Sequence, residues 1–262
     1  SFPEKVLSYK ELAGKSYQEI AEAVLSHFFT NFTAEERKQM IASAYNDMTF
    51  RDDRIVPLHS IDTDLSIAEL FHGRTLAFKD LALSLFPYLL TAAKKQEKED
   101  RDILILTATS GDTGKAALEG FKDVPGTNIM VFYPSEGVSP MQKQQMQKQE
   151  GDNVKVSAIY VNFDDAQSFL KRVFTSAEVN AYANDKGVLF SSANSINIGR
   201  LFPQVAYYVS TYVSLVDNGA ISEGETFDVI VPTGNFGNIL AGYFAKKMGV
   251  PIGKLICASN QN

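Results

Sequence analysis

The stretch Asp102-Ile-Leu-Ile-Leu-Thr-Ala-Thr-Ser-Gly-Asp-Thr-Gly114 places a loop of glycine and hydroxyl residues directly after a short apolar run. The run Asp102–Thr107 has the length and composition of a buried parallel strand. The residues that follow, Lys115–Phe121, have helical character. A strand, a loop and a helix in this order predict a unit of an α/β fold, in which ligands bind at the carboxyl ends of the strands.

The same alternation continues through the chain after Leu70. Further strands are expected at 128–133, 154–161, 227–231 and 254–258, and helices at 80–95, 141–150, 165–179, 201–216 and 239–248. Before Leu70, two capping boxes, Ser16-Tyr-Gln-Glu19 and Thr33-Ala-Glu-Glu36, each open a stretch with apolar residues at helical spacing. The sequence therefore predicts an α/β protein with an N-terminal helical segment.

The composition indicates a protein that folds without disulfides. The 262 residues are 45% hydrophobic and 21% charged, a balance typical of globular proteins. Cys257 is single, and no Cys/His spacing suits a structural metal site. The net charge of −6 and the short apolar run Leu81–Leu90 argue against nucleic acid and membrane partners. We expect a small-molecule ligand, no metal and a cytoplasmic location.

A second glycine-containing loop, Pro232-Thr-Gly-Asn-Phe-Gly-Asn238, follows the strand expected at 227–231. Loops that leave a strand and open a helix present backbone amides and the positive end of the helix dipole, so both loops suit a phosphate or a carboxylate. Neither loop contains GxGxxG or GxxxxGK[ST], which argues against NAD and ATP. The alternative is a pair of turns that use glycine for its backbone freedom.

Lys79 differs from the other lysines because it lies within the apolar segment Thr75-Leu-Ala-Phe-Lys-Asp-Leu-Ala-Leu83. Its side chain either extends from a core element to solvent or is desolvated. A desolvated lysine amine attacks carbonyl groups and forms Schiff bases. An aldehyde cofactor that carries a phosphate would use both this lysine and the glycine-rich loops.

A series of ordered blocks resembles threonine synthase, and the resemblance covers nearly the whole chain. The blocks are Phe71-His-Gly-Arg-Thr-Leu-Ala-Phe-Lys-Asp80, Thr107–Gly114, Ser139–Met146, Asn162–Gln167, Ser192-Ala-Asn-Ser-Ile-Asn-Ile-Gly-Arg200 and Val231-Pro-Thr-Gly-Asn-Phe-Gly-Asn-Ile-Leu240. The resemblance implies the pyridoxal-phosphate fold type II, which is tryptophan synthase β-like, with two α/β domains and parallel-rich sheets. It divides the chain into a helical segment at 1–70, a small α/β domain with the lysine at 71–200, and the start of a large cofactor-phosphate-binding domain at 201–262.

The resemblance also implies the residues of the site. Lys79 is the catalytic residue that holds pyridoxal 5′-phosphate as a Schiff base, and no metal takes part. The residues implied for the cofactor phosphate are Gly234, Asn235, Phe236, Gly237 and Asn238. Those implied for the substrate are Ser110, Gly111, Asp112 and Thr113, of which Asp112 also faces the cofactor ring, together with Asn194, Ser195, Asn197 and Arg200.

The activity implied by the resemblance converts O-phospho-L-homoserine and water to L-threonine and phosphate. The alternatives are a pyridoxal-phosphate lyase or dehydratase that yields an oxoacid, and a non-catalytic fragment that binds a phosphorylated ligand. The family extends on both sides of the equivalent of Ser1–Asn262, and the partner of the pyridine nitrogen lies after it, so we expect a fragment. Arg74 replaces a usual proline and Lys115 a usual small residue, and we expect these departures to tune substrate choice.

Overall fold

The computed structural model describes residues 2–109, 111–136, 138–194 and 197–260, so the predicted site residues Ser110 and Ser195 lie outside the described residues. The chain divides into two units, residues 74–197 and residues 1–73 together with 198–262. The first unit contains α4 (Asp80–Leu83), α5 (Phe86–Gln96), β3 (Asp102–Ala108), α6 (Asp112–Phe121), β4 (Thr127–Pro134), α7 (Pro140–Gln147), β5 (Val154–Ile159), α8 (Phe163–Thr175), α9 (Ala177–Asp185) and β6 (Val188–Ser191).

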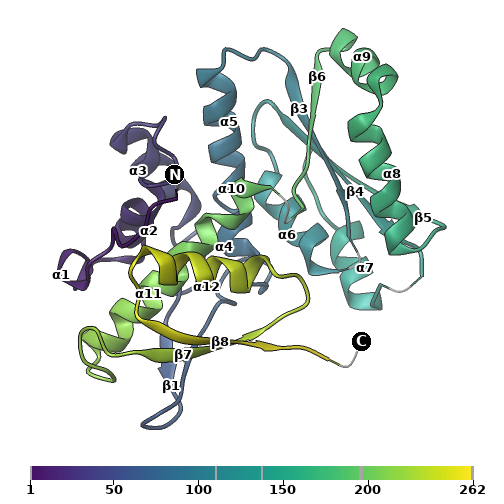
Figure 1. Cartoon of the computed structure of the whole chain (residues 1–262). Helices are drawn as coiled ribbons and strands as arrows, with labels where there is room; N and C mark the ends of the chain where they lie inside the picture. The colour runs from purple at the N-terminus through teal and green to yellow at the C-terminus, as the bar shows by residue number, and fades with distance from the viewer. Residues whose placement is uncertain (1, 110, 137, 195–196, 261–262) are drawn as a thin grey trace. The chain divides into compact units, whose positions relative to one another are not determined.

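The sheet of the 74–197 unit is parallel throughout its described strands, which pair in the order β5-β4-β3-β6 (Figure 1). From β3 the chain adds β4 and then β5 on one side, and it returns to place β6 on the other side of β3. The strand order therefore reverses between β3 and β6. In open α/β sheets, ligands bind at such a switch point, beside the carboxyl ends of the strands.

Apolar side chains from helices cover both faces of this sheet. On one face, Leu83, Phe86, Leu118 and Phe121 of α4, α5 and α6 form a buried cluster with the strands. On the other face, Ala166 and Leu170 of α8 form a buried cluster with Leu106 and Ala108 of β3. Burial on both faces explains the apolar runs of the two central strands, Ile103–Leu106 of β3 and Ile129–Phe132 of β4.

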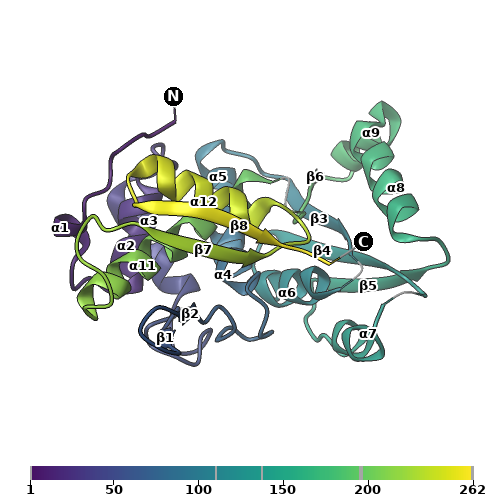
Figure 2. The ribbon, with the colours of Figure 1, turned by 60° about the horizontal axis from the view of Figure 1, so that its bottom comes forward.

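The other unit contains α1 (Tyr9–Leu12), α2 (Tyr17–Leu25), α3 (Ala34–Ala44), β1 (Leu58–Ser60), β2 (Ser66–Ala68), α10 (Ile198–Leu201), α11 (Pro203–Asp217), β7 (Phe227–Pro232), α12 (Gly237–Met248) and β8 (Ile252–Ala258). Strands β7 and β8 are parallel and joined through α12, which lies along them in both ribbon views (Figures 1 and 2). Helix α11 is buried on nearly all sides and packs against α2 and α12. Residues 1–70 thus share a unit with 201–262, whereas the sequence separated them. The three-part division stays a prediction.

Local sequence signals explain where the helices begin and end. Ser16 and Thr33 form the two expected capping boxes with Glu19 and Glu36. The helix expected at 80–95 is interrupted between α4 and α5, where Pro87 lies in the first turn of α5. The helix expected at 165–179 ends at Thr175, and Ser176 caps a separate helix, α9. Within the described ranges, no helix combines the length and apolar character needed to cross a bilayer.

Candidate active site

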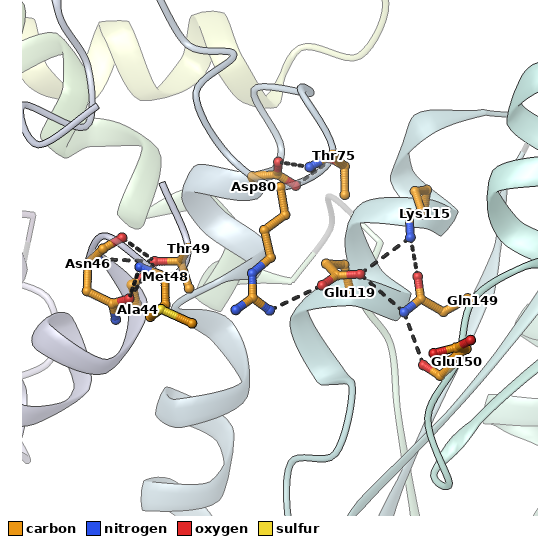
Figure 3. A network of polar contacts seen from close by, with 11 residues as sticks. Ala44, Asn46, Met48, Thr49, Thr75, Asp80, Lys115, Glu119, Gln149 and Glu150 are labelled. Atoms are coloured by element: carbon orange, nitrogen blue, oxygen red, sulfur yellow. Dashed lines mark hydrogen bonds and ion pairs between the residues drawn. The ribbon is translucent and has the colours of Figure 1, made fainter. Parts of the chain in front are cut away.

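Lys79 lies at the N-terminus of α4, after a loop that is fixed by a buried carboxylate. The Asp80 side chain accepts hydrogen bonds from the Thr75 backbone amide at 2.8 Å and from the Thr75 hydroxyl at 2.6 Å (Figure 3). Asp80 is 4% exposed. Burial raises the pKa of this carboxyl above its ordinary value, although the two bonds from Thr75 act in the opposite direction. The hydrogen bonds between Thr75 and Asp80 therefore fix the conformation of the loop that carries Lys79.

The amine of Lys79 is mostly buried and has a charged partner. Its side chain is 15% exposed, and its Nζ atom donates to Oδ2 of Asp112 at 2.8 Å. The same nitrogen lies 4.7 Å from the centroid of the Phe78 ring. Asp112 is half exposed and is the first residue of α6. The structure thus joins the expected Schiff-base lysine to a residue of the first glycine-rich loop.

The first loop uses two of its backbone amides for hydrogen bonds within the loop, so these two amides are not available to the anion that the sequence analysis expected there. Oγ1 of Thr109 accepts from the Gly111 amide at 3.1 Å and from the Gly114 amide at 3.2 Å. Gly114 is tightly packed, because a Cβ there would lie 2.4 Å from Cγ2 of Thr109. The amides of Asp112 and Thr113 lie in the first turn of α6, where the helix supplies no acceptor. These two amides are the ones placed to bind an anion.

The loop after β6 brings a second set of predicted substrate residues to the same edge of the sheet. Ser192 follows β6 directly, and β6 pairs with β3, so this loop and the first loop leave neighbouring strands at the switch point. Nδ2 of Asn197 donates to the Ser192 carbonyl at 3.2 Å, and the Asn197 amide donates to the Asn194 carbonyl at 3.0 Å. Oδ1 of Asn194 is buried and has no hydrogen-bond partner among the described residues. A buried acceptor of this kind suits a donor group on a ligand.

The second glycine-rich loop lies in the other unit, between β7 and α12. It is open around Gly234, where an added Cβ would meet no described atom within 4 Å. Asn235 and Phe236 are exposed, and Phe236 is 67% exposed. At its start, the Thr233 amide donates to the Ala258 carbonyl at 2.8 Å and fixes the loop to β8. Gly237 and Asn238 begin the helix. An exposed, open loop before a helix of this length suits a phosphate.

Two of the implied residues have internal contacts that the sequence did not reveal. Oδ1 of Asn238 accepts hydrogen bonds from the hydroxyls of Tyr207 and Tyr208. Arg200 is 3% exposed, and its backbone carbonyl accepts a hydrogen bond from Nε2 of Gln204 at 2.8 Å. Nε2 of His72, in the lysine block, lies 2.7 Å from Oε2 of Glu69.

Sequence reasoning also missed residues that support the site without belonging to it by resemblance. Thr109 organises the first loop, and Glu119 of α6 contacts Arg74, Lys115 and Gln149 (Figure 3). Thr109 belongs to the glycine-rich stretch quoted in the sequence analysis, so its position in the sequence could have indicated this role. Glu119 was missed because two of its partners, Arg74 and Gln149, are distant in sequence, although Lys115 lies four residues before it on α6.

Known proteins similar to this chain were found by sequence and by structure, whereas no family model matches it. Human threonine synthase-like 1 is 41% identical over 97% of this chain and 35% of its own length. Threonine synthase of Schizosaccharomyces pombe is 39% identical over 95% of this chain and 48% of its own. The chain thus spans about a third to half of the length of these curated relatives.

Solved structures give the same result. Threonine synthase of Brucella melitensis with bound pyridoxal phosphate has a TM-score of 0.84 and 40% identity, covering 98% of this chain and 53% of that chain. Threonine synthase from yeast has a TM-score of 0.85 and 33% identity, and the similarity covers 100% of this chain and 52% of that chain.

These findings define the class first: the fold is fold type II of the pyridoxal-phosphate-dependent enzymes, as the sequence implied. Within this class, the chain is similar to threonine synthases over nearly its whole length. The resemblance inferred from the ordered sequence blocks is thereby confirmed. The roles of individual site residues are a separate matter, and they follow as proposals.

Proposed function

We propose that this chain carries the cofactor-binding lysine of a threonine synthase, a pyridoxal-phosphate-dependent lyase that converts O-phospho-L-homoserine and water to L-threonine and phosphate. The observation that supports this most directly is the likeness to threonine synthases, with a largely buried lysine at the place where their sequence blocks imply it. The chain covers about half of these relatives, so the proposal concerns the protein to which these residues belong.

The residues present fit pyridoxal 5′-phosphate in each unit. In the 74–197 unit, a lysine amine with little exposure lies beside the first turn of α6. In the other unit, the open loop at Gly234 leads into α12, whose N-terminal amides suit the cofactor phosphate. When bound, the cofactor withdraws electrons from the substrate α-carbon and so makes the removal of its proton feasible.

The roles that we propose for this chain's own residues are binding, orientation and proton transfer. Nζ of Lys79 would hold the cofactor and would move protons at the substrate α- and β-carbons. Asp112 orients that nitrogen through the 2.8 Å contact. The residues proposed to bind the substrate carboxylate and phosphate are Ser110, Gly111, Asp112, Thr113, Asn194, Ser195, Asn197 and Arg200. Arg200 offers a planar pair of donors that matches a phosphate.

The decisive test is covalent labelling, because it reports where the cofactor binds without depending on turnover. The protein is incubated with pyridoxal 5′-phosphate, reduced with borohydride and mapped by peptide mass spectrometry. We expect a pyridoxyl group on Lys79, its loss in Lys79→Ala and its retention in Lys95→Ala, which removes an exposed lysine of the same unit. Phosphate release from O-phospho-L-homoserine, with threonine as the co-product, then tests the reaction. Labelling spread over exposed lysines, with none at Lys79, would contradict the proposal.

A further inference from the structure

Two adjacent tyrosines of α11 contact the first turn of α12. The hydroxyl of Tyr207 donates to Oδ1 of Asn238 at 2.6 Å, and the hydroxyl of Tyr208 donates to the same oxygen at 2.7 Å. Tyr208 also lies 3.0 Å from the backbone carbonyl oxygen of Asn238. A carboxamide oxygen accepts two hydrogen bonds, so both of its acceptor positions are filled. The side chain of Asn238 is therefore held in one orientation.

Both tyrosines act as donors under ordinary conditions. Tyr207 is 2% exposed and Tyr208 is 6% exposed. Burial raises the pKa of each phenol above its ordinary value, because the charged phenolate would lose its hydration. Each hydroxyl thus keeps its proton across the whole neutral range. Because the carboxamide is planar, fixing its oxygen also fixes the two N–H donors on its nitrogen.

The contacts continue from Tyr207 to the other implied anion-binding residue of this unit. The Tyr207 hydroxyl lies 3.1 Å from Oε1 of Gln204, whose Nε2 donates to the Arg200 carbonyl at 2.8 Å. Gln204 is 4% exposed, so it too is buried. Because Tyr207 has a single hydroxyl proton, which it donates over the shorter distance to Asn238, its contact with Gln204 is a weaker, shared one. Close polar contacts nevertheless run from the backbone of Arg200 to the side chain of Asn238.

We propose that Tyr207 and Tyr208 are positioning residues for the phosphate group of the cofactor. They hold Asn238, and through it the first turn of α12, in the geometry that receives the phosphate. This inference rests on the proposed function and adds residues that do not themselves touch the cofactor. It requires that the two hydroxyls affect the binding of the phosphate more than the binding of the aldehyde ring.

The test compares pyridoxal 5′-phosphate with pyridoxal, which has the same aldehyde and no phosphate. The affinity of each compound is measured by absorbance titration for the wild-type chain, Tyr207→Phe, Tyr208→Phe and the double variant. Each single variant is expected to weaken binding of the phosphorylated compound by about three- to tenfold, the usual effect of one hydrogen bond, and to leave pyridoxal binding unchanged. The double variant is expected to weaken the binding of pyridoxal 5′-phosphate further.

The matched control is Tyr212→Phe, which removes a hydroxyl from the same helix. Tyr212 bonds to the Gly224 amide at 2.9 Å and does not contact Asn238. This variant should leave the affinity ratio of the two compounds at its wild-type value. Equal weakening of both compounds, or no change in the ratio for the Tyr207 and Tyr208 variants, would overturn the inference.

A second measurement keeps this inference separate from the proposed function. Hydrogen exchange of the amides in 233–240 is compared between the wild-type chain and the double variant, without any ligand. Faster exchange confined to this segment is expected, because α12 loses the bonds that hold its first turn. If the wild-type chain bound neither compound, the proposed function would fail, and unchanged exchange would overturn the positioning role independently.

Discussion

Gly120→Ala should destabilise the 74–197 unit, although alanine normally favours a helix. Gly120 lies near the end of α6, where the helix approaches α4 closely. A Cβ at this position would lie 2.2 Å from the Leu83 carbonyl oxygen and 3.0 Å from its carbon. Ordinary contacts begin at 3.4 Å, so the two helices would have to separate by about 1 Å. The obstacle is backbone, which cannot rotate away as a side chain can.

Two opposing contributions determine the size of the effect. Overpacking of a core contact costs about 1–3 kcal/mol, and a clash with backbone belongs at the upper end of this range. Alanine in place of glycine within a helix contributes about 1 kcal/mol in the other direction. The net loss in the free energy of unfolding is therefore about 2 kcal/mol. If the free energy of unfolding decreases by about 2–3 kcal/mol per molar urea, the urea concentration at the unfolding midpoint should fall by roughly 0.7–1 M.

The assay is urea unfolding followed by circular dichroism, with Gly234→Ala as the matched control. At Gly234 an added Cβ meets no described atom within 4 Å, so the midpoint should stay close to that of the wild type. Because α4 follows Lys79 and α6 begins with Asp112, the separation should also lower the yield of pyridoxyl labelling at Lys79. An unchanged or raised midpoint in Gly120→Ala would refute the argument from close approach.

Three further predictions concern a cap and two carboxylates. Thr33→Ala removes a capping box and should lower the free energy of unfolding by about 1 kcal/mol, measured by thermal melting. The hydrogen bonds from the side chain and the backbone amide of Arg101 lower the pKa of Glu99 to about 2, so its contribution to stability is lost as pH falls from 4.5 toward 2. In Arg101→Ala, NMR titration should show the pKa of Glu99 raised toward its ordinary value, with the retained backbone amide still holding it somewhat lower. Burial raises the pKa of Asp80, so the contribution of this residue to the free energy of unfolding declines as pH rises through that pKa. In Asp80→Asn, urea midpoints measured across this pH range should no longer show that decline.

The strands and capped helices of this chain could be predicted because their signals are local. The runs 102–107 and 128–133 correspond closely to β3 and β4, and Ser16 and Thr33 begin helices as expected. The predicted surface helix after Ser139 is α7. Each of these depends on a few neighbouring residues, whose periodicity and capping chemistry identify the element.

Elements that depend on distant partners were missed. Strand β6 is four half-buried residues, Val188–Ser191, and it is recognisable as a strand through its pairing with β3. The hairpin of β1 and β2 is local, and it was missed for a different reason, because each of its strands has only three residues. The reversal of strand order between β3 and β6 could not be predicted from the sequence of either strand, because it depends on the edge of the sheet to which β6 is added. The position of the ligand site at the sheet edge therefore required the structure.

The predicted site shows the same limit. The apolar neighbours of Lys79 in sequence left open whether its side chain reaches solvent or is desolvated, and the structure shows it 15% exposed. They did not indicate Asp112, which is 33 residues away and supplies the charged partner. Asn238 was implied as a phosphate ligand, yet its contacts with two tyrosines come from a separate helix. The spacing of residues in the sequence indicates which of them can take part in binding or catalysis. The tertiary packing determines which of their atoms can contact a ligand.

Arg74 and Lys115, the two departures from the family pattern, meet at one carboxylate. Oε1 of Glu119 accepts from Arg74 at 3.1 Å, while its Oε2 is contacted by Lys115 at 3.4 Å and by Gln149 at 3.1 Å. Burial alone would raise the pKa of Glu119, but Gln149 and the two cations outweigh it and lower the pKa. A half-buried carboxylate needs such partners to stay charged. Arg74 and Lys115 therefore form one structural group, which joins the segment before Lys79 to the helix that begins at Asp112.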